Sequence, residues 1–204
     1  MKIPVLAAFA AFLLCTGCNK AVDAIAEKVL APSAPATTDG FVRYTIQSGN
    51  QYADGNTYKA VSVSEQAFLV RFDSSAVYTT HAAENQYDIN KLYGFSDNNA
   101  AHHEFSARFG WRWSDGALRL FAYVYNNGAS ASQEITSVPI GKDVACSIRV
   151  AGAAYVFKAG DATVTMPRAS TTALGAGYQL YPYFGGDESA PHAVSIWIKA
   201  LSQP

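Results

Sequence analysis

The clearest alternation of apolar and polar positions runs from Phe105 to Asn126. Two alternating segments flank Asp115-Gly116, a dipeptide that tolerates the positive φ angles of a two-residue type I′ turn. A turn at this point predicts a β-hairpin with four apolar cross-strand pairs on one face: Trp113 with Leu118, Trp111 with Leu120, Phe109 with Ala122, and Ala107 with Val124. We expect that face to be buried in a hydrophobic core.

The opposite face of the same hairpin carries arginines and aromatic rings where a solvated sheet more often carries Thr, Lys and Glu. Its predicted cross-strand pairs are Arg112 with Arg119, Gly110 with Phe121, Arg108 with Tyr123, and Ser106 with Tyr125. Arginine forms bidentate hydrogen bonds with carboxylates, and aromatic rings stack on flat apolar surfaces such as those of sugars. This face is therefore our candidate binding site for an acidic glycan. The alternative is a plain surface on which arginine stems cover exposed rings.

The rest of the chain from residue 40 onward also alternates with period two, in short segments punctuated by Gly, Asn and Asp. Further strands are expected at 41–47, 58–63, 67–72, 76–80, 134–140, 144–150, 155–158, 162–166, 178–184 and 193–200. Residues 81–99 read as the longest irregular stretch, with a short helix or strand at 85–93, and residues 126–133 read as a loop. The pattern predicts an all-β fold, an antiparallel two-sheet β-sandwich.

This strand arrangement resembles the concanavalin A-like jelly roll, a fold of lectins, glycanases and polysaccharide lyases. The segment YQLYPYFGGDESAP, residues 178–191, is similar to the closing strands of some polysaccharide-lyase-like jelly rolls. The resemblance implies a carbohydrate ligand, and it leaves open whether the protein is an enzyme.

Composition narrows the class of protein. Charged residues make up 15% of the chain, the formal net charge is −1, and there are 12 Tyr and 11 Phe. Low charge with many aromatic residues favours an exported β protein. No run of Lys or Arg is present, so nothing indicates a nucleic-acid partner.

The first residues are typical of a targeting segment. Lys2 precedes a short apolar stretch that ends in Cys15-Thr16-Gly17-Cys18. This ending resembles the lipobox of bacterial lipoproteins, although Cys15 stands where that family usually has Leu. The resemblance implies that residues 1–17 are a signal peptide, that Cys18 is lipidated, and that Asn19 directs the protein to the outer membrane. The alternatives are an ordinary secretory signal or a membrane helix.

Residues 18–39 are predicted to tether residues 40–204, the β-sandwich domain, to the membrane. The tether contains a short amphipathic pattern followed by a Pro- and Ala-rich linker. With Cys15 removed and Cys18 acylated, Cys146 has no disulfide partner. We interpret Cys146 as a buried small hydrophobe.

Catalytic candidates lie where the first hairpin strand begins. By strand parity His102 shares the arginine face with Arg108 and Tyr123. A polysaccharide lyase needs a cation to neutralise a carboxylate and a His or Tyr to move protons, which this set supplies. The alternative is that His102 only caps a strand end.

A second candidate is the Gly185-Gly186-Asp187-Glu188 segment with His192. No Cys/His metal spacing occurs, so no metal site is predicted, but Asp187 and Glu188 leave calcium open, together with Asp97 or Asp88. Tyr181 and Tyr183 share a strand parity with Gln179 and are expected to extend the aromatic surface.

These observations predict a lipid-anchored envelope protein whose β-sandwich binds carbohydrate, in particular acidic polysaccharide. The predicted binding residues are Arg108, Arg112, Arg119, Tyr123, Tyr125, Tyr181 and Tyr183. The alternatives are a polysaccharide lyase or glycoside hydrolase of the same fold, or a non-catalytic envelope interaction protein. A hydrolase would require paired carboxylates facing one cleft, and the sequence places its acids in loops.

Overall fold

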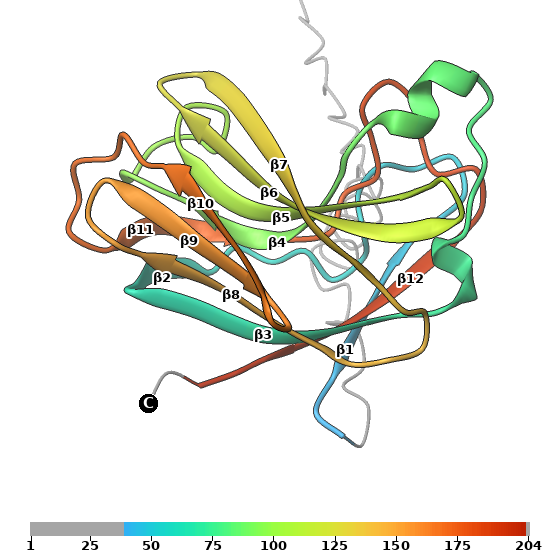
Figure 1. Ribbon diagram of the computed structural model, residues 1–204, viewed down its shortest axis with the longest axis horizontal. Helices are drawn as coiled ribbons and strands as arrows, with labels where there is room; N and C mark the ends of the chain where they lie inside the picture. Colours follow the sequence, from blue (N-terminus) through green and yellow to red (C-terminus); the bar gives the residue numbers. More distant parts are fainter. Residues whose placement is uncertain (1–38, 203–204) are drawn as a thin grey trace, which may run out of the picture. The chain divides into compact units, whose positions relative to one another are not determined.

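Two antiparallel six-stranded sheets stack face to face in the computed structural model, which describes residues 39–202 (Figure 1). The first sheet has the strand order β1-β12-β3-β8-β9-β10 and the second the order β2-β11-β4-β5-β6-β7. In chain order the strands are β1 (Val42–Ile46), β2 (Ala60–Val63), β3 (Glu65–Phe72), β4 (Asn90–Ser96), β5 (Ser106–Ser114), β6 (Ala117–Asn126), β7 (Ala129–Val138), β8 (Val144–Val150), β9 (Ala154–Ala159), β10 (Ala162–Pro167), β11 (Gly175–Leu180) and β12 (Val194–Ala200). The predicted all-β sandwich is confirmed.

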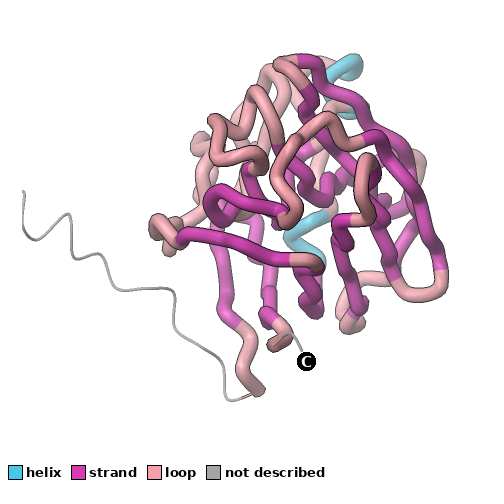
Figure 2. The backbone as a smooth tube through the Cα atoms, turned by 90° about the vertical axis from the view of Figure 1, so that its left-hand side faces the viewer, coloured by secondary structure: helices cyan, strands magenta, loops and turns pink. Residues whose placement is uncertain are grey.

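Helical structure in the described part of the chain is limited to two 3₁₀ segments, η1 (Ser74–Ala76) and η2 (Ala83–Tyr87). Figure 2 shows them beside the strands in the view turned by 90°. No helix of residues 39–202 is long and apolar enough to cross a membrane. The predicted signal peptide, Cys18 and tether lie outside the described residues.

The core fills the space between the sheets with aromatic rings from both layers. Phe109 of β5 contacts Phe68 of β3 and Phe157 of β9, with ring centroids 5.5 and 5.3 Å apart, and all three side chains are fully buried. Cys146 is buried in the same core, and burial raises the pKa of its thiol, so its expected role as a small hydrophobe fits its position.

The β5–β6 hairpin has the predicted register at every pair from Ser106–Tyr125 to Ser114–Ala117. Asp115 and Gly116 both take positive φ, 52° and 70°, as a type I′ turn requires. The apolar face is buried as expected, apart from Trp113. Trp111 is fully buried, whereas Trp113, next to the turn, is only half-buried.

Three stretches differ from the sequence interpretation. Strand β4 occupies the end of the predicted irregular stretch 81–99, because a bulge between Lys91 and Gly94 places both Leu92 and Tyr93 in the core and breaks the alternation. Strand β7 begins in the predicted loop 126–133, because Asn127 and Gly128 form a second tight turn with φ of 52° and 81°. The strand expected at 76–80 is absent. Its start belongs to η1, which Asp73 caps.

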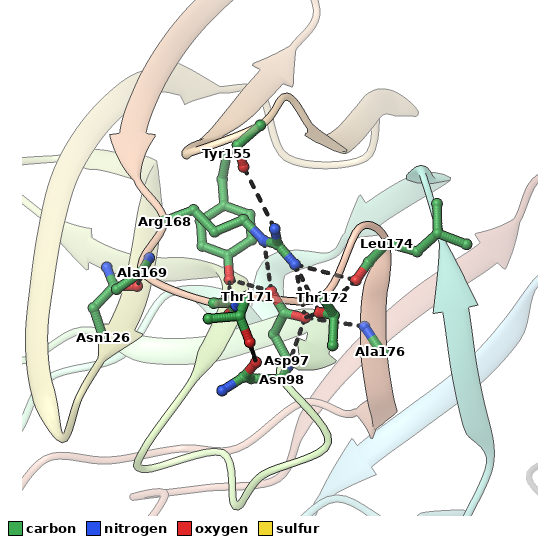
Figure 3. Close-up of polar contacts among 12 residues, drawn as sticks. Asp97, Asn98, Asn126, Tyr155, Arg168, Ala169, Thr171, Thr172, Leu174 and Ala176 are labelled. Atoms are coloured by element: carbon green, nitrogen blue, oxygen red, sulfur yellow. Dashed lines mark hydrogen bonds and ion pairs between the residues drawn. The ribbon is translucent and has the colours of Figure 1, made fainter.

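A buried ion pair fastens the segment between β10 and β11 to both sheets (Figure 3). Asp97, directly after β4, accepts hydrogen bonds from the guanidinium of Arg168 at 2.8 and 3.3 Å and from the hydroxyl of Tyr155. The backbone N–H of Ala176 and the hydroxyl of Thr172 donate to the same carboxylate. Burial opposes ionisation of Asp97, but these donors outweigh it and lower its pKa to about 2.

Candidate functional site

A groove of about 470 Å³ lies over the second sheet, a volume in the range of small-ligand sites. Strands β4, β5 and β6 contribute Lys91, Arg108, Tyr123 and Tyr125 to its lining. The end of β11 and loops supply the remaining walls. The other lining residues are Tyr52, Asn56, His102, His103, Gln179, Leu180, Tyr181, Pro182, Tyr183, Gly185 and Gly186. None of these residues is Asp or Glu.

The predicted binding face of the β5–β6 hairpin is divided in two. Near the Asp115-Gly116 turn, residues 87–89 lie over the sheet, and a Cβ on Gly110 would collide with Ile89. The guanidinium of Arg112 donates to the carbonyl of Tyr87 at 2.8 Å and lies 4.7 Å from the ring centre of Phe121. Only the other half of the face, at Arg108, Tyr123 and Tyr125, opens into the groove.

Arg112 and Arg119 therefore do not line the groove. Arg119 pairs with Glu134 at 2.9 Å and with Asp115 at 3.6 Å. The predicted role of Arg119 in binding an acidic glycan gains no support from this geometry, because its counter-charge lies within the protein. Acidic side chains of the protein itself supply that charge, through strand β7 and the hairpin turn.

Arg108 has no acidic partner among the described residues. The residue is only 7% exposed, its Nη2 donates to the carbonyl of Tyr181 at 3.3 Å, and its Nε–H has no acceptor. Burial lowers its pKa to about 10, opposed only in part by the surrounding tyrosines. Arg108 can pack this closely against β4 because residue 94 is a glycine. A Cβ at Gly94 would collide with the backbone of Ala107 and with Arg108. The groove thus holds a buried cation whose charge is not balanced by any acid of residues 39–202.

Lys91 places a second cation in the same groove. Its ammonium lies 4.5 Å from the ring centre of Tyr123 and donates to the carbonyl of Ile89. Burial and the nearby charge of Arg108 lower its pKa to about 8, against a smaller opposing effect of Asp88. Each cation therefore raises the cost of keeping the other charged, and an anion bound between them would relieve that cost.

His102, expected to join the arginine face, lines the groove together with Arg108 and Tyr123. Its Nδ1 lies 2.9 Å from the hydroxyl of Tyr178. Burial, then the neighbouring charges of His103 and Arg108, lower the pKa of His102 to about 4. The imidazole is therefore neutral at neutral pH, as a proton acceptor must be.

Tyr181 and Tyr183 do not share a face, in contrast to their sequence parity. The ring of Tyr181 packs against Tyr44 and Tyr93 on the core side, whereas Tyr183 contacts the exposed ring of Tyr52 at 4.9 Å. The β4 bulge is the reason. Tyr93, opposite Tyr181, turns into the core, while Lys91, which pairs with Tyr183, lies on the groove side.

The calcium site considered at Asp187 and Glu188 is not formed. The carboxylate of Glu188 accepts hydrogen bonds from the backbone N–H groups of His81 and Ala82 and from the side chain of Asn85. Asp97 is bound to Arg168. No cluster of three His, Cys, Asp or Glu suited to a metal ion occurs in residues 39–202. His192 lies apart from the groove lining and contacts the carbonyl of Ser75.

Sequence reasoning missed Lys91, Tyr52 and Tyr178. Lys91 was hidden in the stretch read as irregular, and the bulge removes the alternation that would have placed it on the arginine face. Tyr52 lies in a turn-rich loop that carries no strand signal. No sequence signal singles out Lys91, because its neighbours are Asn90 and Leu92 and several other single cations of the chain lie between apolar residues.

Comparison with known proteins identifies the fold. No family model matches the sequence, and no curated protein matches it. Among solved structures, the alginate lyase AlyC3 superposes with a TM-score of 0.56 at 8% identity, covering 82% of this chain and 76% of that one. Alginate lyase vAL-1 from Chlorella virus gives 0.54 at 11% identity, covering 82% and 86%. A family 7 alginate lyase in complex with substrate gives 0.50 at 12%, covering 82% and 78%. The expected jelly-roll sandwich is therefore confirmed, and at these identities the likeness concerns the fold alone.

Proposed function

We propose that the domain binds an acidic polysaccharide in the groove, with Arg108 and Lys91 facing carboxylates of the glycan and with tyrosine rings against its sugars. One observation carries the proposal. Arg108 is buried with no acidic partner among the described residues and with a free Nε–H donor. A buried charge is costly unless it is paired, and a carboxylate is the ligand group that a guanidinium binds best.

The surroundings of Arg108 fit a glycan rather than a small inorganic anion. Tyr123, Tyr125 and Tyr183 line the groove beside the two cations, and rings of this kind stack on the apolar faces of sugars. Solved structures with this fold include alginate lyases, whose substrate alginate is a polyuronate. That likeness supports the proposal at the level of the fold.

The test is a binding screen of the full-length chain against alginate, polygalacturonate and neutral dextran. We expect the two polyuronates to bind, more weakly as salt rises, and dextran not to bind. Arg108→Met should remove binding. Arg119→Met is the matched control, because Arg119 lies on the same sheet but is paired with Glu134 and Asp115. Equal polyuronate binding by wild type and Arg108→Met would refute the proposal.

A lyase is the second candidate, favoured by the neutral His102 in the same groove as both cations. In such a reaction His102 would take the proton next to the sugar carboxylate while a C=C bond forms and the glycosidic C–O bond breaks. Tyr123 would return a proton to the leaving oxygen, and Arg108 would hold the carboxylate. A glycoside hydrolase is not favoured, because the groove lining contains no carboxylate pair.

The lyase is tested by the ultraviolet absorbance of the unsaturated product. Activity that disappears in His102→Gln while polyuronate binding is kept would establish the enzyme. Binding without any rise in absorbance in the wild type would leave a binding protein.

We also propose that the chain is a lipoprotein of the bacterial envelope, anchored through Cys18. The lipobox-like ending at Gly17-Cys18 supports this. Cys18→Ala should move the protein from the detergent phase to the aqueous phase in a phase-separation assay. Equal aqueous partition of the variant and the wild type would contradict the anchor.

A further inference from the structure

The two most exposed aromatic side chains in the described part of the chain belong to one segment. Tyr52 is 70% exposed and Tyr58 is 83% exposed, and both lie between β1 and β2. Each ring contacts another tyrosine, which lies either in β11 or in the extended residues directly after it. Tyr52 meets Tyr183 edge-on at 4.9 Å, and Tyr58 lies 6.2 Å from Tyr178 with the ring planes 32° apart.

The two ring pairs mark opposite ends of one extended stretch. Leu180 pairs with Gly94 and Tyr183 pairs with Lys91, so the chain keeps its register with β4 beyond the end of β11. At about 3.4 Å per extended residue, the Cα atoms of Tyr178 and Tyr183 are separated by roughly 17 Å. One sugar ring, or two, cannot contact both pairs.

The ionisable groups of the groove lie in order between these ends. His102 contacts Tyr178 at one end, and Lys91 pairs with Tyr183 at the other. Arg108 lies between them, since its guanidinium bonds the carbonyl of Tyr181. Tyr52 lines the groove, whereas Tyr58 and Tyr178 lie past its His102 end. The aromatic surface thus continues farther than the groove.

We propose that the ligand is a polysaccharide chain that runs along β11, with sugars against Tyr52 and Tyr183 at one end and against Tyr58 and Tyr178 at the other. This inference rests on the proposed function and specifies it: the site binds an internal stretch of an acidic chain and is too long for a monosaccharide or disaccharide. Tyr52 and Tyr58 act as outer subsites on either side of the central carboxylate site at Arg108.

The test measures the affinity of the full-length chain for size-fractionated oligouronates, from the disaccharide to long oligomers. We expect affinity to rise with length until both ring pairs are covered. Tyr58→Ala should weaken the binding of long oligomers roughly five- to tenfold and leave disaccharide binding unchanged, because only a long ligand reaches this ring. Tyr52→Ala should weaken long oligomers similarly.

Tyr87→Ala is the matched control. Tyr87 is also an exposed tyrosine, at 54%, but it lies in η2 and does not line the groove. Unchanged affinity in Tyr87→Ala with a length-dependent loss in Tyr58→Ala supports the inference. Polyuronate binding that does not depend on length, or that survives Tyr52→Ala and Tyr58→Ala together, overturns the inference while the proposed function stands. Failure of the wild type to bind any acidic glycan overturns the proposed function and this inference with it.

Discussion

Two arginines are buried in the part of the chain that the structure describes, and they have opposite surroundings. Arg168 has a side chain only 3% exposed and is bound to Asp97, and it also donates to the hydroxyl of Thr172 and to the carbonyls of Leu174 and Gly152 (Figure 3). Burial lowers the pKa of Arg168, but the pairing with Asp97 outweighs it and the pKa is raised. Arg108 is buried almost as deeply, lacks any acidic partner among residues 39–202, and has its pKa lowered to about 10.

The difference separates a charge that stabilises the fold from one that we propose to be functional. The protein balances Arg168 internally, so that residue can fasten the segment before β11 to both sheets. Arg108, in contrast, lies in a groove without a counter-charge from the described part of the chain, and a second cation, Lys91, adds to the cost. A charge kept in that state lowers stability, and binding an anion is the function that would explain its retention.

The largest effect is expected from breaking the balanced pair. Asp97→Asn should lower the free energy of unfolding by about 3–5 kcal/mol, because Arg168 would stay buried without its counter-charge. Chemical denaturation measures this. Asp143→Asn is the control, since Asp143 pairs with Arg71 at an exposed position and should have little effect. Equal losses of unfolding free energy in the two variants would mean that burial does not determine how much an ion pair contributes to stability.

A smaller effect is expected from giving Arg108 a partner of its own. Tyr125→Glu places a carboxylate on the groove face, diagonal to Arg108 across the β5–β6 pairing. It should compete with the ligand carboxylate and weaken polyuronate binding roughly 10- to 100-fold. Tyr125→Gln removes the same ring without adding charge and should cost less. A glutamate variant that binds as well as the glutamine variant would argue against a carboxylate at Arg108.

The smallest effect is a pH dependence from Lys91, whose pKa is lowered from 10.5 to about 8. A bound carboxylate favours the protonated amine of Lys91, so the affinity should be constant below pH 8. Above pH 8 the free protein loses this proton, and the affinity should fall by roughly tenfold at most per pH unit. Stability should change in the opposite sense. The unfolded chain binds more protons between pH 8 and 10.5, so Lys91 contributes a rise in stability across that window. Lys91→Met should remove both trends, as titrations of affinity and unfolding against pH would show.

How much of this could be read from the sequence depended on local signals. Asp115-Gly116 fixed the register of β5 and β6, because a two-residue turn allows only one pairing, and so it placed Arg108, Tyr123 and Tyr125 on one face. The division of that face could not be predicted. It depends on residues 87–89 covering Gly110 and on Glu134 of β7 reaching Arg119. Both are tertiary contacts, and no hydrophobic periodicity or turn signal in the sequence indicates them. The bulge in β4 explains both why Lys91 was missed and why Tyr181 does not share a face with Tyr183. The two residues of the bulge, Leu92 and Tyr93, are neither Gly nor Pro, so the sequence gives no sign of the shift.

The central claim is that Arg108 is kept at a cost to stability in order to bind an acidic glycan. The most direct test measures the free energy of unfolding of wild type and Arg108→Met, each with and without an excess of long oligouronate. We predict that Arg108→Met without ligand is more stable than wild type by about 1–3 kcal/mol, since a buried unpaired charge is removed. We also predict that the oligouronate stabilises only the wild type. A variant that is less stable than wild type without ligand, and that the oligouronate stabilises as much as it does the wild type, would contradict the account.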